Sequence, residues 1–198
     1  MNLYKPSLCD FNLRKIAKTE IMVSEVFINR DEYEICEEFS HKMWANKKKG
    51  LYGSGMINSP ADPRLVERTG LLGEISVAKL LDLAVNITYM EGGDHQDFVI
   101  SGKRTDVKTS SKNINALLIK ARENDLSELI TLDKDLYIGA YVMEDNRYYK
   151  FAKVGVVGYI PKGNIHTEYL KPARFKDASH INWDVPYADL NPIKNLKA

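Results

Sequence analysis

Three charged residues in the short run "DFVISGKRTDVK" have types and spacing that suit a metal-dependent site. Asp97 opens the run, and Asp106 and Lys108 lie two residues apart near its end. Residues two apart in an extended strand project from the same face. Two neighbouring carboxylates could bind a hard cation such as Mg²⁺ through oxygen, and an ammonium beside them could orient water or neutralise charge on a phosphoryl group. The spacing would therefore suit metal-assisted chemistry on a phosphate ester.

A tight turn would bring these residues together. Gly102 and Lys103 as a two-residue loop, with glycine first, suit a type II′ hairpin. In that register Asp97 pairs with Lys108, and Asp106 is its diagonal neighbour at roughly 7–8 Å. On the hairpin alone, a solvated Asp–Lys ion pair worth about 0.2–1 kcal/mol is the simpler interpretation. The opposite face carries the apolar side chains of Phe98, Ile100 and Val107.

A third carboxylate, Glu74, lies on an apolar face of the helical segment "GLLGEISVAKLL", where its one-turn neighbours are all apolar or glycine. A buried carboxylate is costly unless it is paired or bound to a metal, so we expect Glu74 to have a partner. The alternatives are a metal ion and an ion pair with Arg64 or Arg68. Gly70 and Gly73 each lower helix propensity by about 1 kcal/mol and would let another element approach closely.

The elements that must position these residues follow from the periodicity. A strand is expected at 20–28, followed by a helix over 29–50 with Asn29 as N-cap and Glu32 three residues later. A second helix is expected from Pro63, with an interruption near Gly70 and an end near Asn86. Strands are then expected at 87–90, 97–101, 105–109, 116–121, 136–143, 147–154 and 154–160, with a short helix at 123–130. This order predicts a mixed α/β (α+β) fold around a central sheet.

The stretch "KKKGLYGSGMINSPADP" divides the chain into two parts. Residues 1–58 are expected to form an N-terminal strand and helix addition that serves as a dimer or DNA-gripping surface. Residues 59–198 are expected to form the main domain, which carries the charged cluster.

Composition limits the partners. The 198 residues, 44% hydrophobic and 28% charged, suit a soluble globular chain. A net charge of +1 means that a nucleic acid would have to be held by a local basic surface. Cys9 and Cys36 match neither a zinc spacing nor a disulfide framework. No secretory leader is expected, and no apolar run approaches the roughly 20 residues of a spanning helix, so we expect a cytoplasmic protein without a membrane partner.

The order of a helical glutamate, an aspartate opening a hairpin and Asp-x-Lys on its second strand resembles the PD-(D/E)XK nuclease superfamily. The segments that carry the resemblance are "GLLGEISVAKLL", "GGDHQDFVISG" and "TDVKTSS", within residues 70–111, about a fifth of the chain. The matching residues are Glu74 for the helical carboxylate, Asp97 for the first aspartate, and Asp106, Val107 and Lys108 for the second half of the motif. Gln96 stands in place of the proline of the motif, and Asp94 is the alternative to Asp97 as metal ligand.

The resemblance implies a restriction-endonuclease-like core, a central mixed sheet flanked by helices, and hydrolysis of DNA phosphodiester bonds with Mg²⁺ or Mn²⁺. Asp97 and Asp106 would bind the metal, with the Val107 carbonyl as a further ligand. Glu74 would bind it directly, through water or through a second ion. Lys108 would orient or help to activate the attacking water. The small size suggests a phage or mobile-element protein acting in the host cytoplasm, and a homodimer is expected if both strands are cut.

Basic and hydroxyl residues near the motif are candidates for DNA contact. A solvated strand-end surface is the alternative for most of them, and the helix dipole alone could explain the lysines that end the first helix. The candidates are Lys103, Arg104, Ser110, Lys112, Lys48 and Lys49. A different class of function also remains open: a nucleic-acid-binding or assembly protein that keeps the nuclease fold without cleaving.

Overall fold

The structure is a computed structural model that describes residues 3–6, 12–15, 21–48, 62–87, 97–122, 132–172 and 181–197. The short helix predicted at 123–130 and most of the strand predicted at 87–90 lie outside these residues, as do Lys49, Asp94 and Gln96.

Two α-helices and a set of strands form within the described residues. The helices are α1 (Arg30–Lys48) and α2 (Pro63–Leu81). The strands are β1 (Leu3–Tyr4), β2 (Asn12–Lys15), β3 (Met22–Ile28), β4 (Val85–Asn86), β5 (Phe98–Ile100), β6 (Lys103–Ser110), β7 (Ala116–Arg122), β8 (Leu136–Asn146), β9 (Phe151–Pro161), β10 (Leu170–Pro172), β11 (Ile181–Pro186) and β12 (Asn191–Pro192). The chain is therefore mixed α+β, as predicted.

The largest sheet has the strand order β2-β3-β9-β8-β6-β5, with β12 paired to β9. Its one parallel pair is β6 with β8, and the other pairs are antiparallel. Between β6 and β8 the chain leaves this sheet to form β7, which belongs to a second sheet of order β10-β11-β7. A third, two-stranded sheet joins β1 to β4.

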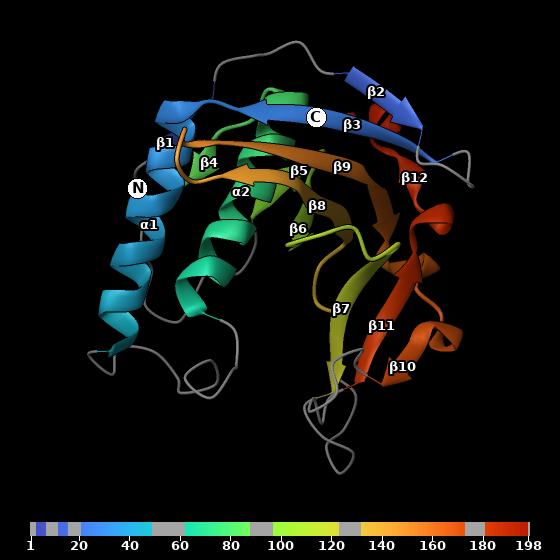
Figure 1. Cartoon of the computed structure of the whole chain (residues 1–198). Coiled ribbons are helices and arrows are strands. Elements are labelled where there is room, and N and C mark those ends of the chain that lie inside the picture. Colours follow the sequence, from blue (N-terminus) through green and yellow to red (C-terminus); the bar gives the residue numbers. More distant parts are fainter. Residues whose placement is uncertain are drawn as a thin grey trace.

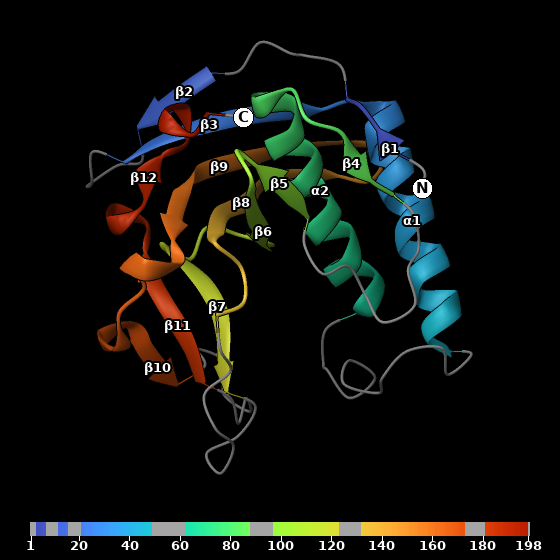
Figure 2. The same cartoon turned by 180° about the vertical axis from the view of Figure 1, so that it is seen from behind.

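The two faces of the large sheet carry separate hydrophobic cores. On one face both helices pack against it, and this first core includes Tyr33, Leu72, Ile75, Ile138 and Val154. On the other face β7 and β11 pack against it, and this second core includes Leu117, Tyr141, Val157, Trp183 and Val185. In Figures 1 and 2 the helices and the three-stranded sheet lie on opposite sides of the picture below strands β3 and β9, so that the ribbon has the outline of an arch with β6 and β8 between its two limbs.

The front part of the chain shares its core with the rest. Strand β3 lies between β2 and β9 in the large sheet, and α1 packs on α2 within the first core. Residues 1–58 thus supply strands β2 and β3 and helix α1 to the same packed layers as residues 59–198. No helix within the described ranges combines the length and apolar character needed to cross a membrane.

The start of α1 confirms the predicted capping box. The Glu32 backbone N–H donates to Asn29 Oδ1 at 3.0 Å, and the Asn29 N–H donates to Glu32 Oε2 at 2.9 Å. Two backbone donors that have no partner inside the helix are therefore satisfied reciprocally. The buried face of α1 also contains Cys36.

Helix α2 differs from the prediction at two points. It continues without interruption through Gly70, because the leucine and isoleucine side chains that follow are buried against the sheet and offset the weak helix propensity of one glycine. It ends at Leu81 rather than near Asn86. Asp82 adopts a left-handed conformation (φ 53°), and the N–H groups of Asp82 and Leu83 donate to the Ala78 carbonyl.

The segment predicted as a strand over 147–154 is instead a turn followed by one long strand. Residues 147–150 form the turn, and β9 then runs without a break through the two strands that were predicted separately. The Tyr149 N–H donates to Asn146 Oδ1 at 3.0 Å, a side-chain contact that favours a turn over an extended chain. Tyr148 and Tyr149 are consequently exposed.

Candidate metal and nucleic-acid site

The turn of the β5–β6 hairpin is one residue earlier than predicted. Ser101 (φ 49°) and Gly102 (φ 74°) are its two central residues, and positive φ at both is what a type I′ turn requires. Val99 therefore pairs with Arg104 rather than with Asp106. The predicted Gly102-Lys103 turn and the direct pairing of Asp97 with Lys108 are wrong. The cross-strand partner of each residue of β5 moves by two positions along β6, so each side chain keeps the face that was predicted for it.

Asp106 and Lys108 lie on the same face of β6 and form an ion pair, with 2.7 Å between Oδ2 and Nζ. The Asp106 side chain is 15% exposed and that of Lys108 is 41% exposed. Their partners across the parallel ladder are Tyr137 and Gly139, which places both charges on the face of the second core. Burial raises the pKa of Tyr137 to about 12, and the charges of Asp133 and Asp106 contribute to this rise.

Asp97 lies one residue before β5, and its carboxylate contacts the backbone of the Asp-x-Lys motif. Its Oδ2 accepts a hydrogen bond from the Val107 N–H at 2.6 Å, while its own N–H donates to the Thr105 carbonyl at 3.1 Å. The carboxylate thus accepts the hydrogen bond that a backbone carbonyl of a longer β5 would have accepted. A strand residue directs its N–H and C=O to the same side, so the Val107 carbonyl faces the same edge of β6. Asp97 is therefore brought directly against the motif.

Glu74 approaches from the opposite side of β6. Helix α2 packs on the face that carries Val107 and Thr109, whereas Asp106 projects from the other face. After burial, the charge of Glu74 is the largest factor that raises the pKa of Cys36 on α1, so Glu74 lies within electrostatic reach of that helix. A ligand shared by Glu74 and Asp106 would have to lie at the edge of β6, where the Asp97 carboxylate meets the backbone.

The two arginines that offered an alternative partner for Glu74 form ion pairs with other carboxylates. Arg64 forms an ion pair with Asp62 at the start of α2. Arg68 is buried, forms ion pairs with Asp145 and with Glu37, and donates a hydrogen bond to the Tyr33 hydroxyl.

The crossing of α2 over β6 depends on Gly73. A Cβ at this position would lie 1.8 Å from Thr109 Oγ1 and 2.9 Å from Thr109 Cβ, whereas a Cβ at Gly70 would meet nothing within 4 Å. The Thr109 hydroxyl is itself buried and has no hydrogen-bond partner among the described residues. Of these two glycines, only Gly73 allows α2 and β6 to approach closely. Gly73 precedes Glu74 on α2, and Thr109, against which it lies, follows Lys108 on β6.

These two glycines give a matched pair of substitutions. We expect Gly73→Ala to lower the free energy of unfolding by about 1–3 kcal/mol, because the new methyl group overpacks the contact with Thr109. Gly70→Ala is expected to raise it by up to about 1 kcal/mol through helix propensity alone. Urea unfolding followed by circular dichroism measures both. Equal effects of the two substitutions would contradict the close approach.

The oxygen atoms at the edge of β6 suit a hard cation. Mg²⁺ commonly uses one or two protein carboxylates and fills the rest of its octahedral shell with water and substrate phosphate. Asp97, Asp106 and the Val107 carbonyl could supply such a partial shell. Within the described residues, however, no three His, Cys, Asp or Glu side chains are grouped closely enough to hold a metal by themselves. The three-carboxylate arrangement expected from the sequence is therefore not assembled in this conformation.

The residues predicted to contact DNA are spread along β6 and beyond it. Lys112 is exposed just past the strand, while Lys103 lies near the turn, about 16 Å from Lys108 along the strand. Arg104 is exposed and lies 3.8 Å from Asp135 Oδ2. The Ser110 hydroxyl donates to the Lys112 carbonyl at 2.6 Å, so it braces the chain after β6 and its proton is not directed at a ligand. Lys48 ends α1, with a side chain that lies outside the described part.

A pocket of about 460 Å³ lies at the end of β6, next to Lys108. Its polar wall comes from Lys108, Ser110, Ser111 and Lys112, and its apolar wall from Ile114, Ala116, Leu118 and Ala140. The apolar wall was not predicted from the sequence. Alternation along "ALLIKA" could have indicated that Leu118 faces away from the core side of β7, but nothing local indicates that this face lies beside the end of β6.

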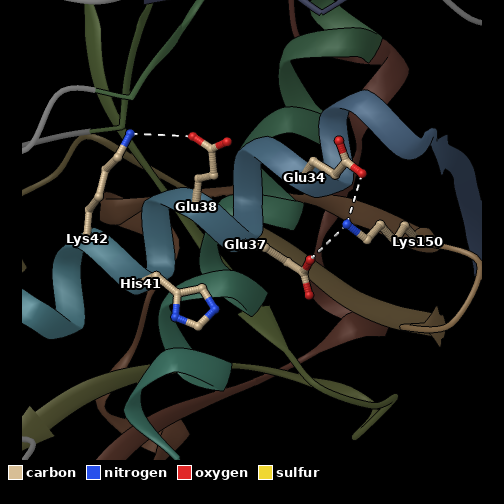
Figure 3. Close-up of a pocket in the computed structure, with 6 residues that line it drawn as sticks. All are labelled: Glu34, Glu37, Glu38, His41, Lys42 and Lys150. Carbon is tan, nitrogen blue, oxygen red and sulfur yellow. Dashed lines mark hydrogen bonds and ion pairs between the residues drawn. The ribbon is translucent and has the colours of Figure 1, made fainter.

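A second pocket, of about 480 Å³, lies along α1 and is shown in Figure 3. It contains three glutamates, but lysines pair with them: Lys150 lies 2.9 Å from Glu34 and 3.9 Å from Glu37, and Lys42 lies 3.5 Å from Glu38. The hydrogen bond from Lys150 lowers the pKa of Glu34. Opposite charges within this pocket therefore largely satisfy one another.

The structure thus brings Asp97, Val107, Asp106 and Lys108 together on one stretch of β6, with Glu74 behind it on α2. Lys112 extends this stretch, and Lys103 and Arg104 lie at its other end. Comparisons of the chain with protein-family models, with curated proteins and with solved structures found no match.

Proposed function

We propose that this protein is a metal-dependent DNA endonuclease that hydrolyses phosphodiester bonds. The observation that best supports the proposal is the 2.6 Å hydrogen bond from the Val107 N–H to Asp97 Oδ2. It brings a second carboxylate, from outside the strand, to the centre of the Asp106-Val107-Lys108 tripeptide. An ion pair on a solvated surface would not require that contact.

Asp97, Asp106 and the Val107 carbonyl would hold Mg²⁺ or Mn²⁺. When bound, such an ion makes a coordinated water more acidic and polarises a phosphoryl oxygen. The reaction adds the oxygen of water to phosphorus and breaks the bond from phosphorus to one sugar oxygen. One proton of the water passes to solvent or to a basic group, and the leaving oxygen takes up a proton.

Lys108 would orient the attacking water and offset the negative charge that grows on the phosphoryl oxygens. Its ammonium already lies 2.7 Å from Asp106, so it stands beside the proposed metal ligand without rearrangement of the backbone. Glu74, which lies on the other side of β6, would act through a bound water or a second ion at the strand edge rather than in the same shell as Asp106.

The DNA backbone would be held by the basic residues along β6 and after it. Lys112 and Arg104 each lie four residues from Lys108 in the chain, on opposite sides of it, and Lys103 would contact a phosphate farther along. Because the net charge is only +1, attraction would be local and sensitive to salt. Lys48 and Lys49 would add contacts from the end of α1. The proposed place of action is the cytoplasm, and cleavage of both strands would favour a homodimer.

The test is cleavage of plasmid, linear and branched DNA in the presence of Mg²⁺ or Mn²⁺, beside the variant Asp106→Ala. We expect the parent chain to convert supercoiled plasmid to nicked or linear forms and the variant to lose this activity. Equal activity in both proteins would assign the cleavage to a contaminant. No activity of the parent on any of these DNAs with either metal would overturn the proposal.

A second candidate function is DNA binding without cleavage. It is favoured by one observation: the Asp106 carboxylate is paired with Lys108, while the described residues form no group of three metal-binding side chains. Mn²⁺ binding measured by electron paramagnetic resonance separates the two candidates. A nuclease should bind the ion, and its affinity for the ion should fall in Asp97→Asn. A non-cleaving protein should instead bind DNA equally well with and without the metal, as a separate DNA-binding measurement would show.

A further inference from the structure

We propose that the pocket at the end of β6 takes one unpaired nucleotide of the DNA substrate, beside the phosphate that is cut. This inference rests on the proposed nuclease function and narrows its substrate class. The preferred DNA would have a single-stranded tail or flap rather than a continuous duplex.

The position of the pocket ties it to the proposed cleavage site. Lys108 belongs both to the ion pair with Asp106 and to the polar wall of the pocket. A molecule in the pocket is therefore within reach of the ammonium proposed to act on the scissile phosphate. The volume of about 460 Å³ lies in the range of pockets that hold small organic ligands, and so suits one nucleotide.

The two walls match the two halves of a nucleotide. Lys108, Ser111 and Lys112 offer positive charge and a hydroxyl, which suit a phosphate. Ile114 and Leu118 offer aliphatic surface, which suits the faces of a sugar and a base. The aliphatic side chains have no donors or acceptors with which to read a base edge, so we expect a preference for DNA structure rather than for sequence.

The energetics favour a base that is already unpaired. A base inside a duplex can enter such a pocket only after it leaves the stack, which costs a few kcal/mol, and the cost is smallest where the strand is already single. The pocket therefore discriminates against continuous duplex without any contact that repels it.

Strand β7 offers a path for the rest of the single strand. Ala116, Leu118 and Lys120 lie on the same face of β7, because side chains alternate along a strand. Ala116 and Leu118 line the pocket, and Lys120 is exposed two residues farther on. A backbone phosphate next to the bound nucleotide could thus meet a lysine as the strand leaves the pocket.

The test compares binding of three fluorescein-labelled DNAs of one sequence: blunt duplex, duplex with a single-stranded tail, and single strand. Fluorescence anisotropy without added divalent metal measures affinity independently of cleavage. We expect the parent chain to bind the tailed duplex at least about 10-fold more tightly than the blunt duplex. Leu118→Trp, which fills the pocket from β7, should reduce this preference to about twofold or less without weakening duplex binding.

Ile114→Trp fills the pocket from the segment between β6 and β7 and gives an independent test if Leu118→Trp fails to fold, as judged by circular dichroism. Leu3→Trp is the matched control, since Leu3 is exposed on β1 and does not line the pocket; it should keep the full preference. A chain that binds and cuts blunt and tailed DNA equally, in parent and variants alike, would overturn the pocket inference and leave the nuclease intact. A chain that neither binds nor cuts any of the DNAs would overturn both.

Discussion

Replacement of Lys108 by methionine is expected to slow DNA cleavage by at least about 100-fold, which corresponds to about 3 kcal/mol of transition-state stabilisation. Methionine keeps most of the length of the side chain and removes only the ammonium. The lost charge lies 2.7 Å from Asp106, where it would orient water and offset charge on the phosphoryl group. The rate with tailed duplex DNA in saturating Mg²⁺ is the measurement.

The structure offers a closely matched control in Lys153→Met. Lys153 is also a strand lysine in an ion pair, 2.6 Å from Glu144, and its side chain is 37% exposed against 41% for Lys108. Both lysine side chains are more than one third exposed, so loss of either ion pair should cost only about 1 kcal/mol of stability and neither substitution should unfold the chain. Cleavage by Lys153→Met should stay within about twofold of the parent.

Metal binding separates the role of Lys108 from that of its neighbours. Lys108→Met should bind Mn²⁺ at least as tightly as the parent, since it removes a positive charge beside Asp106, whereas Asp106→Ala should bind the ion more weakly. If Lys108→Met cleaves DNA at the rate of the parent, the lysine is a structural partner of Asp106 and the proposed mechanism is wrong.

Local features of the fold could be predicted from the sequence because their causes are local. The capping box needs only Asn29 and Glu32 at the right spacing, and the structure contains both of its hydrogen bonds. The shared face of Asp106 and Lys108 follows from strand alternation alone, so this prediction is confirmed although the predicted hairpin register was wrong. That register was wrong because either of two adjacent pairs of residues around Gly102 could form a two-residue turn.

Contacts between distant segments could not be predicted in the same way. Nothing near Asp97 in the sequence indicates that its carboxylate accepts from the Val107 N–H in place of a continuing strand. The second core depends on β11, which the periodicity did not predict and which pairs with β7 across about 60 residues of chain. Glu74 is only partly buried, and its apolar neighbours could not indicate which side of β6 its helix would cover.

A buried ion pair between the two helices is expected to give the largest effect on stability. The Lys79 ammonium on α2 lies 2.8 Å from both carboxylate oxygens of Glu32 on α1 and donates to the Phe27 carbonyl at 2.9 Å. The two side chains are only 3% and 1% exposed. Lys79→Met should lower the free energy of unfolding by about 3–5 kcal/mol, because it leaves the Glu32 charge buried without a counter-charge.

The double variant Lys79→Met with Glu32→Gln tests that cause. Glutamine is neutral and can still reach back to the Asn29 N–H, so the capping box is kept while the buried charge is removed. We expect the double variant to recover at least about half of the lost stability, which would show that the cost lies in the unpaired charge. Urea unfolding of the two variants and of Glu32→Gln alone gives the coupling energy directly.

An exposed pair on α1 serves as the control. Lys42 lies 3.5 Å from Glu38, and both side chains are more than 70% exposed. Lys42→Met should therefore change the free energy of unfolding by no more than about 0.5 kcal/mol. If Lys79→Met is as mild as Lys42→Met, the ion pair does not hold α1 against α2, and the first core alone fixes the helix that carries Glu74 across β6.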